Sequence, residues 1–328
     1  MSTNVKPKVI AYHDLPDIGI QKLRERFNLV HFTDVKQEYE VFLEELKDCK
    51  GLIGMGLPIN AELLANAPEL QIVSNISVGY DNFDIKAMTE HGVMGTNTPG
   101  VLDDTTADAM MTLMLAAARR IPELDRLVKE KKWTDMIGLE NYGVDVHHKK
   151  LGIIGMGRIG SAVAKRAHFG FNMEILYHNR TKNDKVAEEV DATYCDLNEL
   201  LTESDFVLVM APANKEAGHI MGAEQFSRMK QSAIFINGSR GENVDEQALV
   251  KALKEGEILG AALDVFEQEP IQTDHEILEL ENVMTVPHIG SATLETRMKM
   301  FELAVKNLGQ GLQNQEPDNL VNKEVMKR

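Results

Sequence analysis

The sequence predicts an α/β protein with two parallel sheets, each covered by helices. Two series of short apolar runs alternate with segments of helical periodicity, one before residue 100 and one after residue 150. The length of 328 residues suggests two domains of about 150 residues each. Hydrophobic residues make up 43% and charged residues 26% of the chain, which is ordinary for a globular protein and argues against extensive disorder.

The first series is expected to form five strands separated by four helices. Its apolar runs are short, and the segments between them have apolar residues three or four positions apart. This alternation indicates a parallel sheet with helices packed on it. The expected strands are Val9–Tyr12, Leu29–Phe32, Leu52–Ile53, Ile72–Ser74 and Val93–Gly95, and the expected helices are Ile18–Phe27, Glu38–Cys49, Ala61–Ala67 and Ile85–His91.

One long helix is predicted from Thr105 to Lys132, with Thr105 or Thr106 as its N-cap. Its middle is apolar on nearly all sides, which indicates burial between layers. Residues 134–150 have weak periodicity and are interpreted as a connector. The second series follows, and a last helix at Ala292–Leu312 is not assigned to either domain by periodicity alone. The expected strands of this series are Leu151–Ile154, Glu174–Tyr177, Phe206–Met210, Ala233–Ile236, Ile258–Ala262 and Val283–Val286.

The charge balance argues against several kinds of partner. There are 35 Lys and Arg against 51 Asp and Glu, a formal net charge of −16. Such an acidic surface repels nucleic acids and anionic membranes, so neither is expected as a partner. No apolar stretch is long enough to span a bilayer, and no signal peptide is visible. Cys49 and Cys195 show no metal or disulfide-framework spacing, so no metal site is expected and a cytoplasmic location is favoured.

A glycine-rich motif, Gly155-Met-Gly157-Arg-Ile-Gly160, follows an apolar strand and opens an amphipathic helix. In this context Gly155 permits a tight turn, Gly157 lets the backbone approach a diphosphate, and Gly160 allows the helix to pack closely on the strand. The diphosphate then lies at the helix N-terminus, where free N–H groups favour negative charge. The alternative is an ordinary glycine-rich turn, but the flanking strand and helix favour a dinucleotide site.

The end of the next predicted strand indicates which nicotinamide cofactor is used. NAD sites usually place an Asp or Glu there to bind the ribose hydroxyls, but no acid occurs from Ile175 to Asn183. Arg180 can instead bind a 2′-phosphate through two hydrogen bonds. NADPH is therefore expected as the preferred cofactor, with NADH as the alternative. The competing interpretation is that Arg180 and Lys182 belong to a solvated loop.

Three side chains suited to acid–base or anion-binding chemistry follow the last predicted strands. They are Arg240 in NGSRG, Glu269 in LDVFEQEP and His288 in VPHIGSAT. Each alone has an ordinary explanation, as a surface ion pair, a solvated carboxylate or a strand-end histidine. Together they lie at the carboxyl ends of strands in one dinucleotide-binding unit, where α/β sheets bind ligands. This joint position predicts a reaction centre.

The motifs GMGRIG, NGSRG, LDVFEQEP and VPHIGSAT together resemble the D-isomer-specific 2-hydroxyacid dehydrogenase family. The resemblance extends over nearly the whole chain, including SVGYDN at residues 77–82 and Thr106-Ala-Asp. The segments ISVGYDNFD, DVHHK and RAHFGFNM are most similar to the bacterial glyoxylate/hydroxypyruvate reductases that also reduce 2-ketogluconate.

The resemblance implies a particular division of the chain. A flavodoxin-like substrate domain comprises residues 1–104 and 291–328 and is closed by the last helix. A Rossmann dinucleotide-binding domain comprises residues 105–290. The family also implies a homodimer and a 2-keto or 2-hydroxy acid as the small-molecule substrate, reduced with NADPH to the D-2-hydroxy acid.

The resemblance implies that Arg240, Glu269 and His288 are catalytic. Protonated His288 gives its proton to the carbonyl oxygen, while Glu269 orients the imidazole and favours its charged form. Arg240 binds the carboxylate and the carbonyl. The implied substrate-binding residues are Val78, Gly79, Arg240 and Ser291. The implied cofactor-binding residues are Thr106, Gly155, Gly157, Arg158, Ile159, Gly160, Asn179, Arg180, Thr181, Pro212, Gly238, Asp264, His288 and Gly290.

Other functions within the same architecture stay open. Formate dehydrogenases pair the histidine with Gln, so Glu269 argues against them. Many phosphoglycerate dehydrogenases carry an additional regulatory domain, which is not expected here. Some relatives are nucleotide-sensing interaction proteins, and the complete Arg, Glu and His set argues against that role. One departure from the family pattern is the loop of residues 211–217, which is usually richer in Leu and Thr, so its side-chain contacts are not carried over.

Overall fold

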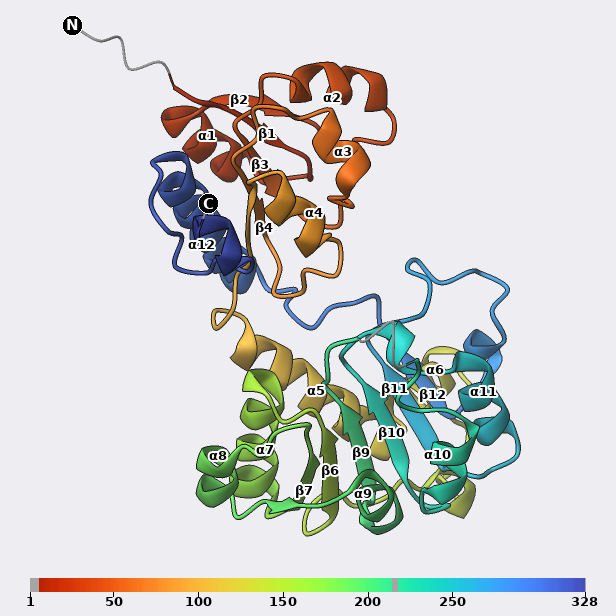
Figure 1. Ribbon diagram of the computed structural model, residues 1–328. Helices are drawn as coiled ribbons and strands as arrows, with labels where there is room; N and C mark the ends of the chain where they lie inside the picture. The colour runs from red at the N-terminus through yellow and green to blue at the C-terminus, as the bar shows by residue number, and fades with distance from the viewer. Residues whose placement is uncertain (1–5, 214–217, 328) are drawn as a thin grey trace, which may run out of the picture. The chain divides into compact units, whose positions relative to one another are not determined.

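The computed structural model describes residues 6–213 and 218–327, and the chain divides into two compact units. Unit 1 comprises Met1–Leu102 and Thr293–Arg328, and unit 2 comprises Asp103–Ala292 (Figure 1). Each unit contains one sheet in which every pair of neighbouring strands is parallel. The predicted fold class, two parallel-sheet α/β domains, is confirmed.

The sheet of unit 1 has the strand order β2-β1-β3-β4-β5, the flavodoxin-like order of a doubly wound fold. Helices connect successive strands, as parallel pairing requires. The strands are β1 (Lys8–Ala11), β2 (Asn28–His31), β3 (Gly51–Gly54), β4 (Ile72–Asn75) and β5 (Met94–Thr96), and the helices are α1 (Asp17–Arg26), α2 (Tyr39–Leu46), α3 (Ala61–Ala65), α4 (Ile85–Glu90), α12 (Leu294–Leu312) and the 3₁₀ helix η4 (Lys323–Lys327).

Helix α12 returns the end of the chain to the sheet of unit 1. Thr293 caps the helix, because its side-chain oxygen accepts the N–H of Thr296. Ser74 on β4 donates to the carbonyl of Ala304 at 2.9 Å. At Gly311 a Cβ atom would lie 2.5 Å from the side chain of Ile72, so the small residue lets the helix approach the strand closely. The last helix is therefore part of the unit 1 core.

The sheet of unit 2 has the strand order β12-β11-β10-β9-β6-β7-β8. The order reverses between β6 and β9, and α/β sheets bind ligands at such switch points. The strands are β6 (Lys150–Ile154), β7 (Glu174–His178), β8 (Thr193–Tyr194), β9 (Phe206–Val209), β10 (Ile234–Asn237), β11 (Gly260–Leu263) and β12 (Val283–Thr285). The helices are α5 (Asp103–Ala118), α6 (Ile121–Lys129), α7 (Arg158–Phe171), α8 (Asp184–Glu189), α9 (Leu197–Glu203), α10 (Ala223–Arg228), α11 (Glu246–Lys254), and the 3₁₀ helices η1 (Leu139–Asn141), η2 (Gly241–Asn243) and η3 (Glu276–Glu279).

Two apolar clusters fill unit 2, one on each face of its sheet. The first contains residues of α5 and α7, and the second contains residues of α9, α10 and α11 (Figure 1). Strand residues alternate between them, so that Ile153 belongs to the first cluster and Ile154 to the second. A sheet buried on both faces explains why its strands read as nearly continuous apolar runs.

The prediction of one helix from Thr105 to Lys132 is wrong, because the segment forms α5 and α6 with a break between them. Arg120 has a φ of 53°, in the left-handed region. Pro122 has no N–H to donate within a helix, and in a continuous helix its ring would clash with the carbonyl of the residue four positions earlier. That carbonyl, of Ala118, instead accepts the N–H of Val144 at 2.8 Å. The expected N-cap at Thr105 or Thr106 is also wrong, since α5 begins at Asp103.

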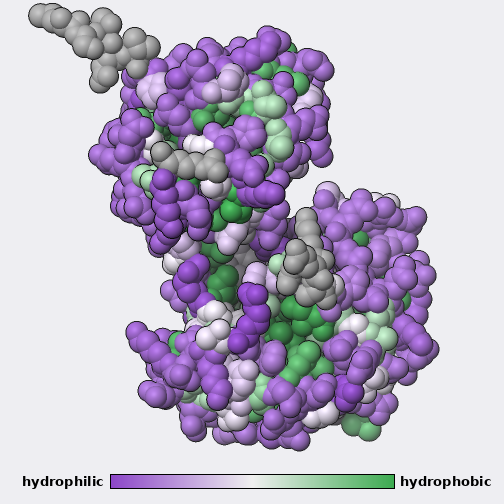
Figure 2. All heavy atoms as spheres, viewed as in Figure 1, coloured by the Kyte–Doolittle hydropathy of each residue, from purple (hydrophilic) through white to green (hydrophobic). Residues whose placement is uncertain are grey.

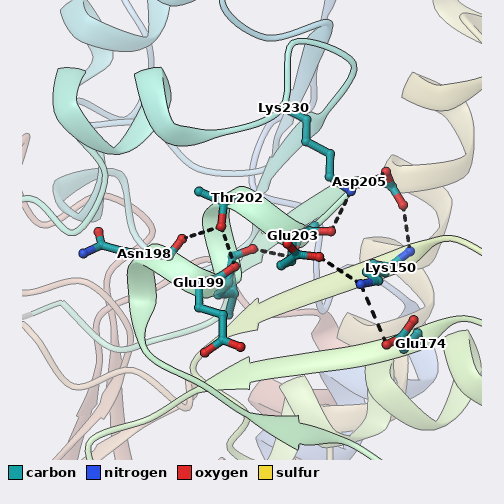
Figure 3. A network of polar contacts seen from close by, with 10 residues as sticks. Lys150, Glu174, Asn198, Glu199, Thr202, Glu203, Asp205 and Lys230 are labelled. Atoms are coloured by element: carbon teal, nitrogen blue, oxygen red, sulfur yellow. Dashed lines mark hydrogen bonds and ion pairs between the residues drawn. The ribbon is translucent and has the colours of Figure 1, made fainter.

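An ion-pair network closes the amino-terminal edge of the unit 2 sheet (Figure 3). Asp205, just before β9, accepts the backbone N–H of Lys150 at 2.9 Å and lies 3.0 Å from the Lys230 ammonium. Burial alone would raise the pKa of Asp205, but these two contacts outweigh burial and hold the pKa below its usual value. The Lys150 ammonium lies 3.0 Å from Glu203. This network joins β6, the start of β9 and the segment between α10 and β10 at the edge opposite the glycine-rich turn.

Hydrophilic side chains cover most of the visible surface of each unit, with smaller apolar areas between them (Figure 2). This distribution matches the high charge of the chain. In the described ranges, no helix has the length and apolar character needed to cross a bilayer.

Candidate active site

The glycine-rich turn follows β6 at the switch point of the unit 2 sheet. Gly155 has a φ of 99°, and a Cβ atom there would lie 2.4 Å from the backbone nitrogen of Ala211, just after β9. At Gly160 a Cβ atom would lie 2.6 Å from the carbonyl oxygen of Gly155. At Gly157 a Cβ atom would meet nothing within 4 Å. Two glycines thus pack the turn tightly, while the third leaves open space beside the backbone.

Helix α7 begins at this turn with an uncapped N-terminus. Its N-cap residue, Gly157, has no side chain, and the first N–H bonded within the helix is that of Ser161, to the carbonyl of Gly157. Within the described part of the chain, the N–H groups of Arg158, Ile159 and Gly160 form no hydrogen bond. Together with the helix dipole they can bind an anion. The open turn and these donors fit the diphosphate of a dinucleotide.

The loop after β7 is tied to the glycine-rich turn by Asn179. Its side-chain oxygen accepts the N–H of Met156 at 2.7 Å, and the Tyr194 hydroxyl donates to the Asn179 carbonyl at 3.2 Å. Arg180 and Thr181 are exposed, and the Lys182 ammonium lies 4.9 Å from the centre of the Tyr194 ring. The loop therefore presents two cationic side chains and no carboxylate beside the turn.

The structure brings Glu269 and His288 into contact at the carboxyl edge of the sheet. Nδ1 of His288 lies 2.8 Å from Oε2 of Glu269, and the other carboxylate oxygen accepts the N–H of Phe266 at 3.1 Å. The His288 side chain is 49% exposed, and its Nε2 has no hydrogen-bond partner in the ranges that the structure describes. The imidazole is therefore oriented through one nitrogen and available through the other.

The electrostatic surroundings keep Glu269 ionised. Partial burial would raise the pKa of Glu269, but the hydrogen bond and charge of His288, the Phe266 N–H and the Arg240 guanidinium together hold the pKa below its usual value. Arg240 follows β10, and its guanidinium donates to the carbonyl of Ser239 at 2.7 Å. Arg240, Glu269 and His288 thus belong to one group of interacting charges.

Asp264, at the end of β11, holds the backbone that carries His288. Its carboxylate accepts the N–H groups of Ile289 and Gly290, the second at 2.9 Å, and its carbonyl accepts the N–H of His288 at 2.9 Å. His288 has a φ of 52°, an unusual value for a residue with a side chain. Burial raises the pKa of Asp264, and the two N–H donors partly offset that effect. Asp264 therefore fixes the direction of the histidine.

Two further predicted cofactor residues, Thr106 and Gly238, line the same part of unit 2. At Gly290 a Cβ atom would lie 3.1 Å from the Thr106 side chain, so the two residues are neighbours. At Gly238 a Cβ atom would overlap the Met110 side chain. Ser291 is partly buried directly after Gly290, whereas Pro212 is exposed after β9. In the loop that departs from the family pattern, residues 214–217 lie outside the described residues.

In unit 1, Val78 and Gly79 form a turn after β4. The carbonyl of Val78 accepts the Asn97 amide at 2.8 Å, and the carbonyl of Gly79 accepts the Ser77 hydroxyl at 2.6 Å. Among the described residues, the N–H groups of Val78 and Gly79 have no acceptor. The carbonyls of the turn are thus occupied, while its two backbone N–H groups are left as donors.

Sequence reasoning missed residues that hold these groups in place. Gly241 is one, since a Cβ atom there would lie 1.9 Å from the carbonyl carbon of Phe266. Gly241 directly follows Arg240 in the NGSRG motif, and this position could have indicated that Gly241 has a structural role at the site. Glu246 is another, and its side chain accepts the N–H of Glu267 at 2.8 Å. A single glutamate in the first turn of a helix is common, so the sequence carried no signal for it.

The dinucleotide cradle lies at the switch point of the sheet, and a histidine–glutamate pair and an arginine lie at the same edge. This combination defines an oxidoreductase of the nicotinamide-dependent α/β class. Residues 111–290 match the NAD binding domain of the D-isomer specific 2-hydroxyacid dehydrogenases. The chain belongs to this family, as the sequence motifs predicted.

Similar proteins support this assignment along nearly the whole chain. Glyoxylate/hydroxypyruvate reductase B from Escherichia coli K12 is 50% identical over 326 residues, which is 98% of this chain and 99% of the relative. The NADPH-dependent glyoxylate/hydroxypyruvate reductase of Sinorhizobium meliloti, solved with NADP and malonate, is 30% identical, with a TM-score of 0.87 and 98% of each chain covered. The TT0316 protein of Thermus thermophilus is 38% identical, with a TM-score of 0.87, covering 96% of this chain and 99% of that one.

Proposed function

We propose that this protein reduces a small 2-keto acid to the D-2-hydroxy acid with NADPH, and that glyoxylate, hydroxypyruvate and 2-ketogluconate are its candidate substrates. The observation that carries the proposal is the 2.8 Å contact between His288 and Glu269 at the edge that also holds the dinucleotide cradle. The 50% identical Escherichia coli glyoxylate/hydroxypyruvate reductase B supports the substrate class.

His288 is the proposed general acid, and the bound nicotinamide supplies the hydride. As the carbonyl carbon is reduced, negative charge grows on its oxygen, and Nε2 of a protonated His288 donates a proton there. Glu269 holds Nδ1 and favours the imidazolium by its negative charge. In the oxidative direction the neutral imidazole accepts the proton of the hydroxyl group instead.

The substrate carboxylate needs several fixed donors. Arg240 can bind a carboxylate with two parallel hydrogen bonds, which fixes its plane as well as its position. The N–H groups of Val78 and Gly79 are the proposed backbone donors, and Ser291 adds a hydroxyl. These assignments follow from the donor types and from the family resemblance.

Cofactor selection is assigned to the loop after β7. Asn179 holds this loop against the glycine-rich turn, and the exposed Arg180 and Thr181 are the proposed partners of the 2′-phosphate. NADPH is favoured because no carboxylate there repels that phosphate, and NADH is the weaker alternative. The remaining proposed contacts are Gly155, Gly157, Arg158, Ile159 and Gly160 for the diphosphate, Pro212 beside it, and Thr106, Gly238, Asp264, His288 and Gly290 for the nicotinamide end.

A substrate panel tests the proposed activity directly. Purified enzyme is mixed with glyoxylate, hydroxypyruvate or 2-ketogluconate and either NADPH or NADH, and the absorbance of the reduced nicotinamide is followed. We expect turnover with at least one of these acids and a higher kcat/KM for NADPH. Oxidation of 3-phosphoglycerate without reduction of any panel member would instead identify a phosphoglycerate dehydrogenase. Cofactor binding without turnover of either kind would favour a nucleotide-sensing protein.

A homodimer is proposed as the working form, joined through an apolar arm of residues 121–142. Exposed apolar side chains gather on this arm, and monomers rarely expose so many together. Met136 is 91% and Leu139 81% exposed, and a cavity of about 520 Å³ beside the arm is lined in part by Pro122, Tyr142 and Leu280. The apolar arm residues are Ile121, Val128, Trp133, Met136, Ile137, Leu139 and Tyr142.

Sedimentation tests this assembly. The wild type is expected at twice the chain mass of 36.6 kDa, and a double substitution, Met136→Lys with Leu139→Lys, is expected to shift it to the monomer. Ile18→Lys, an equally apolar site exposed on α1 of unit 1, is the matched control and should remain dimeric. A monomeric wild type would refute the assembly.

The free, buried state of both cysteines suits a reducing compartment such as the cytoplasm, where we place the reaction.

A further inference from the structure

The loop that carries Glu269 is joined to the first residue of α11 by a reciprocal pair of hydrogen bonds. The N–H of Glu267 donates to Oε1 of Glu246 at 2.8 Å, and the N–H of Glu246 donates to Oε1 of Glu267 at 3.2 Å. The Glu246 side chain is only 8% exposed. A buried carboxylate therefore fixes the backbone two residues before Glu269.

The second oxygen of Glu246 lies beside His275. Nε2 of His275 lies 3.3 Å from Oε2 of Glu246, and Nδ1 accepts the backbone N–H of Ile277 at 3.2 Å. Because Nδ1 acts as an acceptor, the proton of the neutral ring is on Nε2, the nitrogen that faces Glu246. Oε1 of Glu246 thus accepts a backbone N–H, and Oε2 lies beside the Nε2 edge of the His275 ring, where a carboxylate oxygen is better suited than the NH₂ group of an amide.

Several charged groups surround this carboxylate. Burial raises the pKa of Glu246, and the negative charges of Glu267 and Glu269 add to that effect, whereas the Glu267 N–H and His275 oppose it. His219 lies 3.8 Å from the Glu267 carboxylate. The pKa of Glu246 is raised on balance, because the Glu267 N–H and His275 offset the burial only in part.

A short series of hydrogen bonds to one backbone segment connects Glu246 to the proposed acid–base pair. The N–H of Glu267 is bound by Glu246, and the preceding N–H, of Phe266, is bound by Glu269. Glu269 in turn accepts Nδ1 of His288 at 2.8 Å. Gly241 packs against the same peptide so closely that no side chain fits between them. Two consecutive peptide units are thus fixed, the first by Glu269 and the second by Glu246 and Gly241.

We propose that Glu246 is a positioning residue for the acid–base pair, and that His275 keeps Glu246 in its working orientation. This inference rests on the proposed function, since it assigns Glu246 a role through Glu269 and His288. Without the Glu246 carboxylate, the Glu267 N–H is left without an acceptor and the loop moves to satisfy it. The contact between Glu269 and His288 then lengthens, and the imidazolium is less favoured.

The test compares three variants. Glu246→Gln keeps the volume but has one oxygen in place of two, so its NH₂ group must face either the Glu267 N–H or Nε2 of His275. His275→Asn removes the Nε2–H donor, while its side-chain oxygen can still accept the Ile277 N–H. Asp245→Ala is the matched control, because Asp245 caps the same helix through Ala248 one residue away and does not touch the Glu269 loop.

Two measurements are made on each variant. In the reductive assay, we expect kcat to fall about 10- to 100-fold in Glu246→Gln, and less in His275→Asn, as for other residues that hold a reacting group in place. The pH at which the reductive rate is half-maximal should also move below that of the wild type. Independently of activity, the Nδ1–H proton resonance of His288 should shift or broaden, because it reports the hydrogen bond to Glu269. The control should leave the pH profile and this resonance unchanged.

The outcomes separate the positioning role from the proposed function. If neither Glu246→Gln nor His275→Asn moves the pH profile or the resonance, the positioning role is wrong, whatever the enzyme reduces. If the resonance moves but the wild type reduces no 2-keto acid, the positioning role stands and the proposed function fails. If Glu246→Gln does not fold, the result for His275→Asn decides whether the positioning role holds. If Asp245→Ala moves the resonance as much as the test variants do, the effect comes from general loosening of α11 and the proposal is overturned.

Discussion

Oε2 of Glu269 accepts Nδ1 of His288 at 2.8 Å, while Oε1 of the same carboxylate is held by a backbone N–H. Both oxygens are occupied, so the carboxylate cannot turn away from the imidazole without losing a hydrogen bond. This arrangement makes the charge state of one residue depend on the other, and the dependence can be measured.

The first prediction concerns the pH profile of reduction. The pKa of Glu269 is lowered, so its carboxylate is charged throughout the neutral range and favours imidazolium at His288. Glu269→Gln keeps a hydrogen-bonding group but removes the charge, so the rate of reduction should fall at a lower pH than in the wild type. His288→Gln should flatten this limb and lower kcat about 10²- to 10⁴-fold. An unmoved profile in Glu269→Gln would assign the tuning elsewhere, with Glu267 the first residue to test.

The second prediction concerns cofactor choice. Arg180→Ala should raise the KM for NADPH and leave that for NADH nearly unchanged, because only NADPH carries the 2′-phosphate. A charge-assisted contact worth about 1.5–3 kcal/mol corresponds to roughly 10- to 150-fold. Lys182→Ala is the matched control, since Lys182 lies over the Tyr194 ring in the same loop. Equal losses with both cofactors would show that Arg180 has a structural role.

The third prediction concerns Asp264 and stability. Asp264→Asn has one acceptor oxygen where two backbone N–H groups, of Ile289 and Gly290, require acceptors. An unsatisfied buried donor costs about 1–3 kcal/mol, so the free energy of unfolding from urea titration should fall by this amount. Turnover should fall as well, because the same N–H groups fix the backbone beside His288. A variant with wild-type stability would mean that Asp264 is not the anchor of this turn.

The fourth prediction separates structural charges from reacting ones. Because the pKa of Asp205 is lowered in the folded state, its stabilising contribution is complete above the ordinary value of 3.8 and is lost as pH falls below it. Asp205→Asn should reduce the free energy of unfolding by about 1–3 kcal/mol at neutral pH, and the difference from the wild type should shrink in acid. Turnover per folded molecule should be unchanged, since Asp205 lies at the opposite edge of the sheet from the glycine-rich turn. A large loss of turnover would contradict this separation.

All but one of the strands could be predicted because buried parallel strands leave continuous apolar runs in the sequence. Strand β8 (Thr193–Tyr194) could not, since both of its residues are exposed at a sheet edge. The break after α5 was missed because the apolar pattern runs on past Ala118, and Pro122 was the signal that should have weighed more. At the site, the strand-end positions of Arg240, Glu269 and His288 were readable from the sequence. Glu246 was not, because its partner is distant along the chain and only folding brings them together.

Segment 119–143 begins and ends at one point of unit 2, where the carbonyl of Ala118 meets the N–H of Val144 and Gly143 packs against the same carbonyl. The apolar arm of residues 121–142 lies within this segment, so it is an insertion whose two ends are adjacent. Its length and sequence can therefore change without shifting the register of any strand. The proposed homodimer contact and the proposed reduction are thereby encoded in different stretches of chain. Relatives could diverge in how their copies assemble while their chemistry stays the same, and an engineer could exchange one property without rebuilding the other.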